Sequence, residues 1–476
     1  MSAVKPKELP VADEKAEECT RARFLVCFVT TAFLTVLVGN SLALNFTVIC
    51  MHEGGAPLFS ERQISLLFSA VAAGTLGGSL PFAQLQRRAG MRWALVLHGA
   101  LSAAATFGLP PATRAGFWAV VVCRFLHGWA LACVYPAIGG VTSEWATWEQ
   151  SGTSTALLST SLQLGAVLTM PLAGVVCGSR WGWPLLYVLQ GAATLLATAA
   201  FFSVFRDSPA AHPLVNAREA ALLRRHKADG RAGRRVPVRA IAADPAAWGI
   251  FAGFFGASFA FQLFNQYTPV YLSRVLELRV ESAGWAAALP PLAGLVVKLL
   301  VGPLSDHLPL LSARCRLVLF ASAAALAQAV CFVTLAALPA SRPLWAQAAF
   351  TAAVGCSGLN AVGVMKATQL VAGPFAAVLM AVNQLLASVG LLVLPPIVAA
   401  VAPHNTRQEV SSRRWGVSSS CFQWAILLVG TALFVLATTA FFDLTATATP
   451  RPWATGNDEK KQTVFRISGR MEGLTR

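Results

Sequence analysis

Long apolar runs dominate this chain and set the limits on its fold. About twelve segments are each long enough to cross a bilayer, whose hydrocarbon core of about 30 Å needs about 20 apolar residues in a helix. They lie near residues 22–51, 62–86, 92–111, 115–142, 152–177, 183–205, 246–272, 282–304, 316–338, 344–366, 374–402 and 424–446. The sequence therefore predicts an all-α polytopic membrane protein with twelve transmembrane helices.

The charge content agrees with a membrane protein and argues against a nucleic-acid partner. Only 12% of the 476 residues are charged and 56% are hydrophobic, too few charges to coat a soluble globule of this size. The net charge of +16 comes from basic residues that gather near residues 5–23, 87–92, 218–239 and 460–470. These are tails and short connections, as the positive-inside rule requires. We expect both termini to be cytoplasmic and membrane lipids to surround the protein.

Neither the N-terminus nor the cysteines indicate processing or a cofactor. The first twenty residues carry acids as well as lysines and lead into a run too long for a signal peptide, so we expect an uncleaved first helix. The ten cysteines form no CxxC pair and mostly lie in apolar runs. We therefore expect neither a disulfide framework nor a zinc site, and no cofactor.

One long polar connection, Arg206–Pro245, divides the runs into six and six. The predicted organisation is a cytoplasmic tail (1–21), a six-helix half (22–205), a cytoplasmic basic linker (206–245), a second half (246–446) and a cytoplasmic tail (447–476). Two such halves with a site between them at mid-membrane are the basis of alternating access. Within the linker, the amphipathic stretch Asn216–Lys227 is either a membrane-surface helix or a solvated one.

Two loops at the same place in each half share a pattern. The loop after the second run reads Ala83-Gln-Leu-Gln-Arg-Arg-Ala-Gly-Met-Arg92, and the one after the eighth begins Gly302-Pro-Leu-Ser-Asp306. Both resemble the GxxxDRxGRR loop of the major facilitator superfamily, although Arg87 stands where the first should have its aspartate. The residues that match this gating loop are Arg88, Gly90, Arg92, Gly302 and Asp306. With the layout of six and six, they predict the fold of that superfamily.

Further segments resemble one family within it. The stretch Arg124-Phe-Leu-His-Gly-Trp-Ala-Leu-Ala-Cys-Val-Tyr-Pro136, with Met170-Pro-Leu-Ala-Gly174 and Asn405-Thr-Arg-Gln-Glu409, is similar to the anion:cation symporters, which include sialin, vesicular glutamate transporters and sodium/phosphate cotransporters. The likeness covers residues 22–455. It implies a transporter, not an enzyme, that carries a small organic or inorganic anion across a plasma, endolysosomal or vesicular membrane. Protons or sodium are the candidate coupling ions, and we expect a monomer.

Arg124 is the first candidate for substrate binding. A charge inside an apolar run costs at least about 2.5 kcal/mol, so it usually faces a cavity. The resemblance places it on the family's fourth-helix arginine, and a forked guanidinium suits a carboxylate or phosphate. The competing role is an internal hydrogen-bonded charge that locks helices together. Other charges of the family are missing: Leu131 replaces a glutamate tied to proton coupling, and the remaining positions fall near Ala43, Phe68 and Ser258. Glutamate transport is therefore not expected.

His127 lies one helical turn from Arg124 and is either a proton relay or an inert hydrogen-bonded side chain. Other polar residues inside apolar runs complete the predicted substrate site, and an interhelical hydrogen bond is the competing role for each. They are Tyr135, Gln163, Gln262, Asn265, Gln266 and Asn383. Three of these, Gln262, Asn265 and Gln266, share one helix face by their spacing. Lys298 and Lys366 are expected to extend along the helix toward the cytoplasm.

Residues 410–423 interrupt the family pattern before the last run. Val-Ser at 410–411 is what a splice donor would encode, and Ser-Ser-Ser-Cys-Phe-Gln at 418–423 is what a pyrimidine tract ending in an acceptor would encode. One hypothesis is a retained in-frame intron, and the other is a genuine loop.

Two other function classes compete with transport. A transporter-like receptor or sensor, which binds a ligand without moving it, is consistent with the missing charges. A membrane-embedded enzyme would need a catalytic grouping, and the sequence shows no Ser/His/Asp arrangement, HExxH motif or phosphate-binding loop.

Overall fold

The computed structural model describes residues 22–53, 56–147, 150–224, 236–270, 280–306, 311–338, 343–401 and 419–455. The helices of the first half are α1 (Ala22–Thr47), α2 (Glu61–Ala115), α3 (Phe117–Leu131), α4 (Val134–Trp145), α5 (Ser151–Ser159), α6 (Ser161–Cys177) and α7 (Pro184–Val204). Those of the second half are α10 (Pro245–Val270), α11 (Val280–Asp306), α12 (Ala313–Ala337), α13 (Pro343–Ser357), α14 (Val364–Ala372), α15 (Ala376–Val401) and α17 (Ser419–Thr445). Shorter elements are β1 (His52–Glu53) paired with β2 (Ala56–Pro57), α8 (Ala217–Arg224), α9 (Val238–Ala242), α18 (Pro452–Thr455) and the 3₁₀ turns η1 (Pro209–Ala211), η3 (Gly358–Ala361) and η4 (Gly373–Phe375).

The chain crosses the membrane twelve times, as the apolar runs predicted. Ten helical stretches of the described residues are long and apolar enough to span a bilayer. Two of them, Arg62–Ala115 with 54 residues and Leu344–Val398 with 55, are long enough to cross twice, since a helix rises about 1.5 Å per residue. Each turns back at a glycine with positive φ, Gly90 at 85° and Gly373 at 49°. A side chain rarely adopts this backbone conformation, so glycine permits both reversals.

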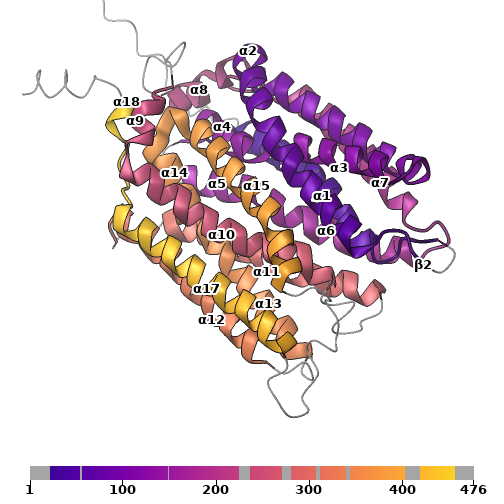
Figure 1. Ribbon diagram of the computed structural model, residues 1–476. Helices are drawn as coiled ribbons and strands as arrows, with labels where there is room; N and C mark the ends of the chain where they lie inside the picture. Colours follow the sequence, from indigo (N-terminus) through magenta and orange to yellow (C-terminus); the bar gives the residue numbers. More distant parts are fainter. Residues whose placement is uncertain are drawn as a thin grey trace, which may run out of the picture.

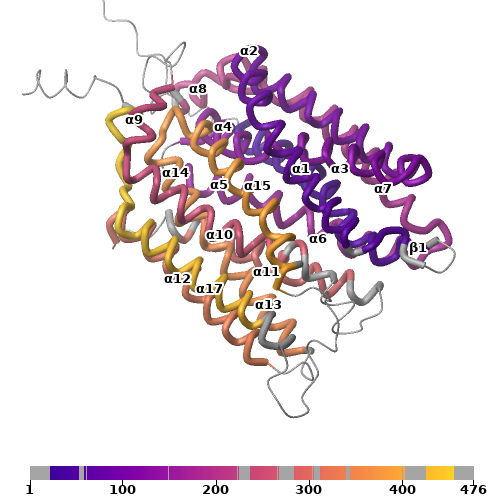
Figure 2. Tube along the Cα trace, viewed as in Figure 1, coloured from indigo at the N-terminus to yellow at the C-terminus, as the bar shows by residue number. Residues whose placement is uncertain are grey.

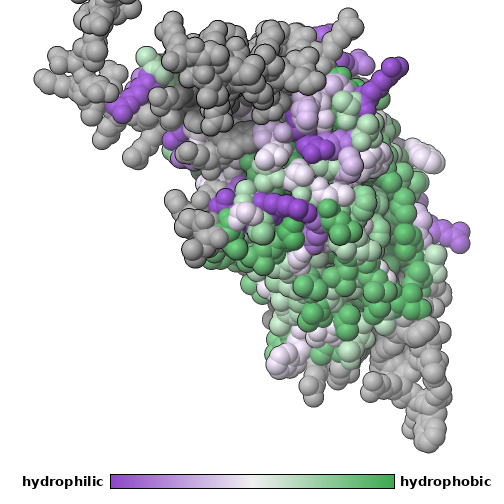
Figure 3. Space-filling view, turned by 90° about the vertical axis from the view of Figure 1, so that its left-hand side faces the viewer, coloured by the Kyte–Doolittle hydropathy of each residue, from purple (hydrophilic) through white to green (hydrophobic). Residues whose placement is uncertain are grey.

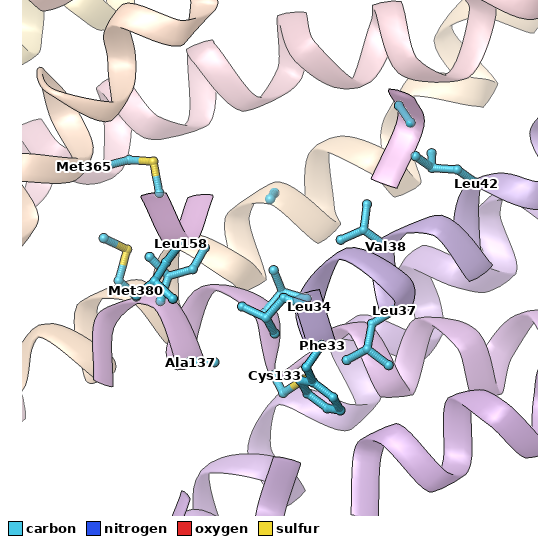
Figure 4. Close-up of a cluster of buried hydrophobic side chains, with 14 of the residues drawn as sticks. Phe33, Leu34, Leu37, Val38, Leu42, Cys133, Ala137, Leu158, Met365 and Met380 are labelled. Carbon is cyan, nitrogen blue, oxygen red and sulfur yellow. The ribbon is translucent and has the colours of Figure 1, made fainter. Parts of the chain in front are cut away.

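The two six-helix halves lie side by side. Figure 1 shows the helices of residues 22–204 on one side of the molecule and those of 245–445 on the other. They meet where α11 contacts α5 and α6, and where α15 contacts α2 and α4. The buried core continues across this boundary: in Figure 4, Met365 and Met380 of the second half lie near Leu158 of the first, and all three belong to one cluster of buried side chains.

The outer surface is apolar where a soluble protein would be polar. Leu196, Leu300 and Leu433 expose 73%, 66% and 63% of their surface. Figure 3 shows one face on which hydrophobic side chains form a broad area, while hydrophilic ones gather toward the upper end. Such an extended apolar surface needs lipid around it. The chain is an integral multi-pass membrane protein.

The loop at residues 83–92 is hydrogen-bonded to an acidic residue from another part of the chain. Asp207, which follows α7, accepts a hydrogen bond from the backbone N–H of Arg92 at 2.9 Å. A Cβ on Gly90 would lie 2.5 Å from the Asp207 carboxylate, so the glycine makes this approach possible. The Arg92 guanidinium donates to the carbonyl of Phe202 and covers its ring, while Arg88 is exposed. Asp207 thus supplies a carboxylate to a loop that has Arg87 in place of its own aspartate.

The second loop is described only in part. Gly302 is buried on α11, where a Cβ would lie 3.1 Å from the Cβ of Ala156 on α5, so it contributes to packing between the halves. Asp306 is the last residue of α11, and its side chain lies outside the described part of the structure. Of residues 410–423, only the stretch from Ser419 is described, as the start of α17. The intron hypothesis therefore stays a prediction.

Part of the linker is docked on the protein. Glu219 of α8 is fully buried and accepts hydrogen bonds from the backbone N–H groups of Ala22 and Arg23, both at 3.3 Å. These donors are left without partners by the start of a helix, and a carboxylate is favourable there. In Figures 1 and 2, α8, α9 and α18 lie at one end of the molecule, and β1 and β2 lie at the opposite end. The described part of the amphipathic stretch therefore packs against the start of α1.

A second buried acid links the residues just before α10 to those that follow α17. Asp244, just before α10, accepts two hydrogen bonds from Arg451 at 2.7 and 2.8 Å and one from the indole N–H of Trp453 at 2.7 Å. Burial raises the pKa of this carboxyl, but these donors and the backbone N–H of Ala246 outweigh it, so the pKa lies below its ordinary value. The carboxylate therefore fastens α18 to the start of α10.

The expectation that the cysteines form no disulfide was wrong for one pair. Cys50, just after α1, is bonded to Cys177 at the end of α6, 127 positions further along the chain. Both apolar runs end at the same side of the membrane, which brings the two thiols together although no local sequence pattern marks them. Six other cysteines in the described part of the chain are free, as expected for small hydrophobic side chains.

We expect Cys177→Ser to lower the stability of the protein by about 2–4 kcal/mol, because the disulfide closes a long loop and restricts the unfolded chain. Thermal unfolding of the purified protein, with and without reductant, measures the change. The exposed free cysteine Cys315 provides the matched control, and Cys315→Ser should behave as wild type. Equal unfolding temperatures for all three proteins in the absence of reductant would show that the bond does not form or contributes nothing.

Candidate functional site

The fourth span of each half is interrupted near its middle. Ala132 and Cys133 separate α3 from α4, and the 3₁₀ turn η3 separates α13 from α14. Irregular backbone at membrane depth is tolerated where it is buried in protein or lines a cavity. Residues beside both interruptions, Leu131 and Val134 in one and Asn360 and Val364 in the other, line two cavities between the halves. The geometry therefore places a polar site at the corresponding depth of both halves.

The first cavity has a volume of about 100 Å³ and takes its walls from α1, α2, α3, α4 and α6 of one half and from α10 and α15 of the other. Its polar lining residues are Ser41, Asn45, Arg124, Tyr135, Gln262, Gln266 and Gln384, and the remaining walls are apolar. Apolar walls with a few converging polar groups are typical of a site for a small molecule.

Arg124 is the charge in this cavity, and its partners are all neutral. It is only 2% exposed. Its guanidinium donates to the carbonyl of Ser41 at 2.8 Å, to the carbonyl of Leu67 at 3.4 Å and to the side-chain oxygen of Asn45 at 3.5 Å. No described carboxylate pairs with it, and the last two bonds are long. A buried cation whose hydrogen-bond acceptors are all neutral is stabilised strongly when an anion binds beside it and compensates its charge.

The second cavity has a volume of about 60 Å³ and adjoins the first, because Tyr135, Leu162 and Phe261 line both. Lys298 on α11 contributes its charge. The side chain is 4% exposed, and its ammonium donates to the carbonyl of Ser159 at 3.1 Å and to the side-chain oxygen of Gln163 at 2.8 Å. The expectation that Lys298 extends to the cytoplasm was wrong. About two helical turns separate it from the end of α11, and it turns toward the other half instead.

The structure brings together five of the residues that the sequence suggested for substrate binding. Arg124, Tyr135, Gln262 and Gln266 line the first cavity, and Gln163 lines the second. The side-chain oxygen of Gln266 is buried and has no hydrogen-bond partner among the described residues, so a ligand donor can bind it. The hydroxyl of Tyr135 lies near the side chain of Ser258, which lines the second cavity.

Three other candidates lie elsewhere or are not described. His127 lines neither cavity, and its Nε2 lies 3.0 Å from the hydroxyl of Thr106 on α2. Asn383 is fully buried beside Met380, whereas its neighbour Gln384 faces the first cavity. The side chain of Asn265 lies outside the described part of the structure. Lys366 is buried on α14 and lines neither cavity.

Three of the four positions that the resemblance to the anion:cation symporters singles out for missing charges line these cavities. Leu131 and Phe68 line the first, and Ser258 lines the second, whereas Ala43 is in the core. Leu131, Phe68 and Ser258 therefore give these cavities neutral lining residues. The described residues that line the two cavities include no acid and no histidine, and their charges are those of Arg124 and Lys298.

A comparison with protein families matches residues 22–395 to the Major Facilitator Superfamily. The chain belongs to this superfamily. The fold agrees: a bacterial homolog of the human lysosomal transporter Spinster, solved in an inward-facing and occupied conformation, superposes with a TM-score of 0.57. The alignment covers 89% of this chain and 96% of that one at 16% sequence identity. The two loops and the arrangement of six and six helices therefore predicted the superfamily correctly.

Curated relatives come from the anion:cation symporters that the motifs indicated. Mouse sodium-dependent phosphate transport protein 1 is 24% identical over 57% of this chain and 63% of its own length. Zebrafish vesicular glutamate transporter 2.1 is 23% identical over 90% of this chain and 72% of its own length. The match spans less than two thirds of the phosphate transport protein. At this identity the relatives show what the chain is similar to, whereas the superfamily rests on the match over residues 22–395.

Proposed function

We propose that this protein is a secondary active or facilitative transporter of small organic or inorganic anions. The observation that carries the proposal is Arg124, a guanidinium buried between the two halves whose described hydrogen-bond acceptors are all neutral. An anion entering the first cavity would gain charge-assisted hydrogen bonds that these acceptors do not provide. The phosphate and glutamate transporters among the relatives support an anionic substrate.

Movement would follow from the contacts between the halves. Toward the end of the molecule that carries α18, Gly139 of α4 packs against α15, and a Cβ there would lie 2.8 Å from Met380. Toward the opposite end, Gly284 of α11 packs against α6, and a Cβ would lie 2.8 Å from the carbonyl of Met170. Rocking of the halves (22–205 and 246–446) about the site would separate one contact while preserving the other, which is alternating access.

Orientation follows from charge and from the disulfide. The basic residues of the chain gather in the two tails, the loop near residues 87–92 and the linker at residues 206–245. Because cytoplasmic segments of membrane proteins carry an excess of Lys and Arg, we place both termini and the linker in the cytoplasm. Cys50 and Cys177 then face the cell exterior or the lumen of a vesicle, where disulfides form. Protons or sodium are the proposed coupling ions, and the functional unit is a monomer.

Uptake into proteoliposomes tests the function. The full-length protein is reconstituted, and labelled phosphate, urate, sialate, aspartate and nucleotides are offered under an imposed pH, sodium or voltage gradient. We expect at least one anion to accumulate above the level in protein-free liposomes and to be lost when the gradient is collapsed. A saturable binding signal without accumulation would refute transport and would instead indicate ligand sensing.

A further inference from the structure

We propose that Lys298 is a second anion-binding group and that the substrate carries two separated anionic groups, one bound by Arg124 and the other by Lys298. The inference rests on the proposed transport of anions and adds the class of substrate. Arg124 belongs to the first half and Lys298 to the second, so such a molecule would contact both halves at once.

The first argument is the state of the Lys298 ammonium. It is almost fully buried, and its two hydrogen-bond acceptors, the carbonyl of Ser159 and the side chain of Gln163, are neutral. An ammonium has three N–H donors, and the third has no described protein partner. The desolvation of a buried cation is costly unless a negative charge compensates it. The described part of the chain offers Lys298 no carboxylate partner, and an anionic ligand in the adjoining cavity would supply that charge.

The second argument is the relation between the two cavities. They share the walls formed by Tyr135, Leu162 and Phe261, and each contains one of the two cations. The described lining residues of both cavities include no acid. A substrate with one negative charge would compensate only one cation and leave the other buried with neutral partners. A substrate with two anionic groups would neutralise both, and the shared side chains lie where the connecting part of the molecule would pass.

The surroundings of Lys298 favour a ligand at this place. The adjoining backbone is the 3₁₀ turn η3, whose residues Asn360 and Ala361 line the same cavity. Broken helices at mid-membrane are common where transporters bind substrates and ions. The side chains of Gln163 and Ser258 add polar groups that can orient a carboxylate or phosphate.

A purely mechanical role for Lys298 makes a different prediction. Its bonds to Ser159 and Gln163 join the two halves, so Lys298 would act as a lock that strengthens this conformation. Removing a lock changes the transport of every anion by the same factor. Removing an anion-binding group weakens the binding and transport of substrates with two anionic groups. Binding and transport of substrates with one anionic group stay nearly unchanged.

The test compares ligands that differ in one charge. Dicarboxylates from malonate to adipate are each paired with their monomethyl ester, which keeps the length but removes one carboxylate. Binding to the purified full-length protein is measured as ligand-induced thermal stabilisation, and accumulation is measured in proteoliposomes. The variants are Lys298→Gln and the charge-retaining Lys298→Arg. Lys366→Gln is the matched control, because Lys366 is also buried in the second half but lines neither cavity.

We expect wild type to bind at least one dicarboxylate about tenfold or more tightly than its ester, which is the effect of one charged hydrogen bond. Lys298→Gln should remove this preference, and Lys298→Arg and Lys366→Gln should retain it. The second anion-binding group would be refuted if wild type bound each ester as tightly as its diacid, or if Lys298→Gln kept the preference for the diacid. Neither result would contradict the proposed transport of anions. If Lys298→Gln does not fold, the comparison of each diacid with its ester on the wild-type protein decides whether a second anionic group is bound. No uptake of any anion would instead refute the proposed function.

Discussion

Arg124→Gln is expected to reduce anion uptake by about 10- to 100-fold while the protein still inserts in the membrane. Arg124 is the one charged residue among those that line the first cavity, and its guanidinium has only neutral acceptors. A charged hydrogen bond is worth about 1.5–3 kcal/mol, which corresponds to this range of affinities. Glutamine preserves a polar side chain but offers neither the charge nor the forked donors. Initial rates of uptake into proteoliposomes, normalised to reconstituted protein, measure the loss.

Two further variants separate binding from structure. Arg124→Lys keeps the charge as a point donor without the planar fork, so it should retain part of the activity toward small anions. Arg180→Gln removes an exposed arginine that packs on the ring of Trp181, and it should transport as wild type. If Arg124 served only to join helices, Arg124→Gln would lower the unfolding temperature but leave uptake per folded molecule unchanged. That result would contradict a role in the substrate site.

Much of the fold was readable from the sequence because the membrane imposes a simple rule. A helix that spans the hydrocarbon core needs a minimum apolar length, and this rule located the spans without information from tertiary contacts. The basic linker and the two loops then defined the two halves. The loop that contains Gly90 was also anticipated, although the turn at this glycine, with a positive φ beside the carboxylate of Asp207, appears only in three dimensions.

The candidate site was only partly predictable, since hydropathy gives the depth of a residue and not the neighbour it faces. Arg124 was found because an arginine inside a long apolar run is costly and therefore conspicuous in the sequence. Lys298 was interpreted as a surface-seeking side chain, although Gln163 and Ser159 from the other half provide partners inside the protein. His127 follows Arg124 by only three residues, yet it turns to Thr106 on α2 instead of a cavity. Such differences depend on how helices distant in sequence pack.

The packing that holds Arg124 in place depends on two glycines that face each other across α2 and α3. A Cβ on Gly128 would lie 1.9 Å from the carbonyl oxygen of Val71, and one on Gly74 would lie 2.0 Å from that of Phe125. The hydroxyl of Thr75 also donates to the carbonyl of Gly128 at 3.0 Å. Small residues of this kind let two helix backbones approach closely in a membrane. Any side chain at either position must force the helices apart.

Gly128→Ala is therefore expected to destabilise the protein by about 1–3 kcal/mol, the usual effect of overpacking, and also to impair transport. Arg124 lies one helical turn earlier on α3, and its bond to the carbonyl of Leu67 on α2 is already 3.4 Å long. Separating these helices would break that bond and shift the guanidinium within the cavity. Thermal unfolding and uptake per folded molecule measure the two effects. Gly430→Ala is the matched control, because a Cβ at Gly430 meets nothing within 4 Å. If Gly128→Ala unfolded and transported like Gly430→Ala, the close approach of α2 and α3 would not be what positions Arg124.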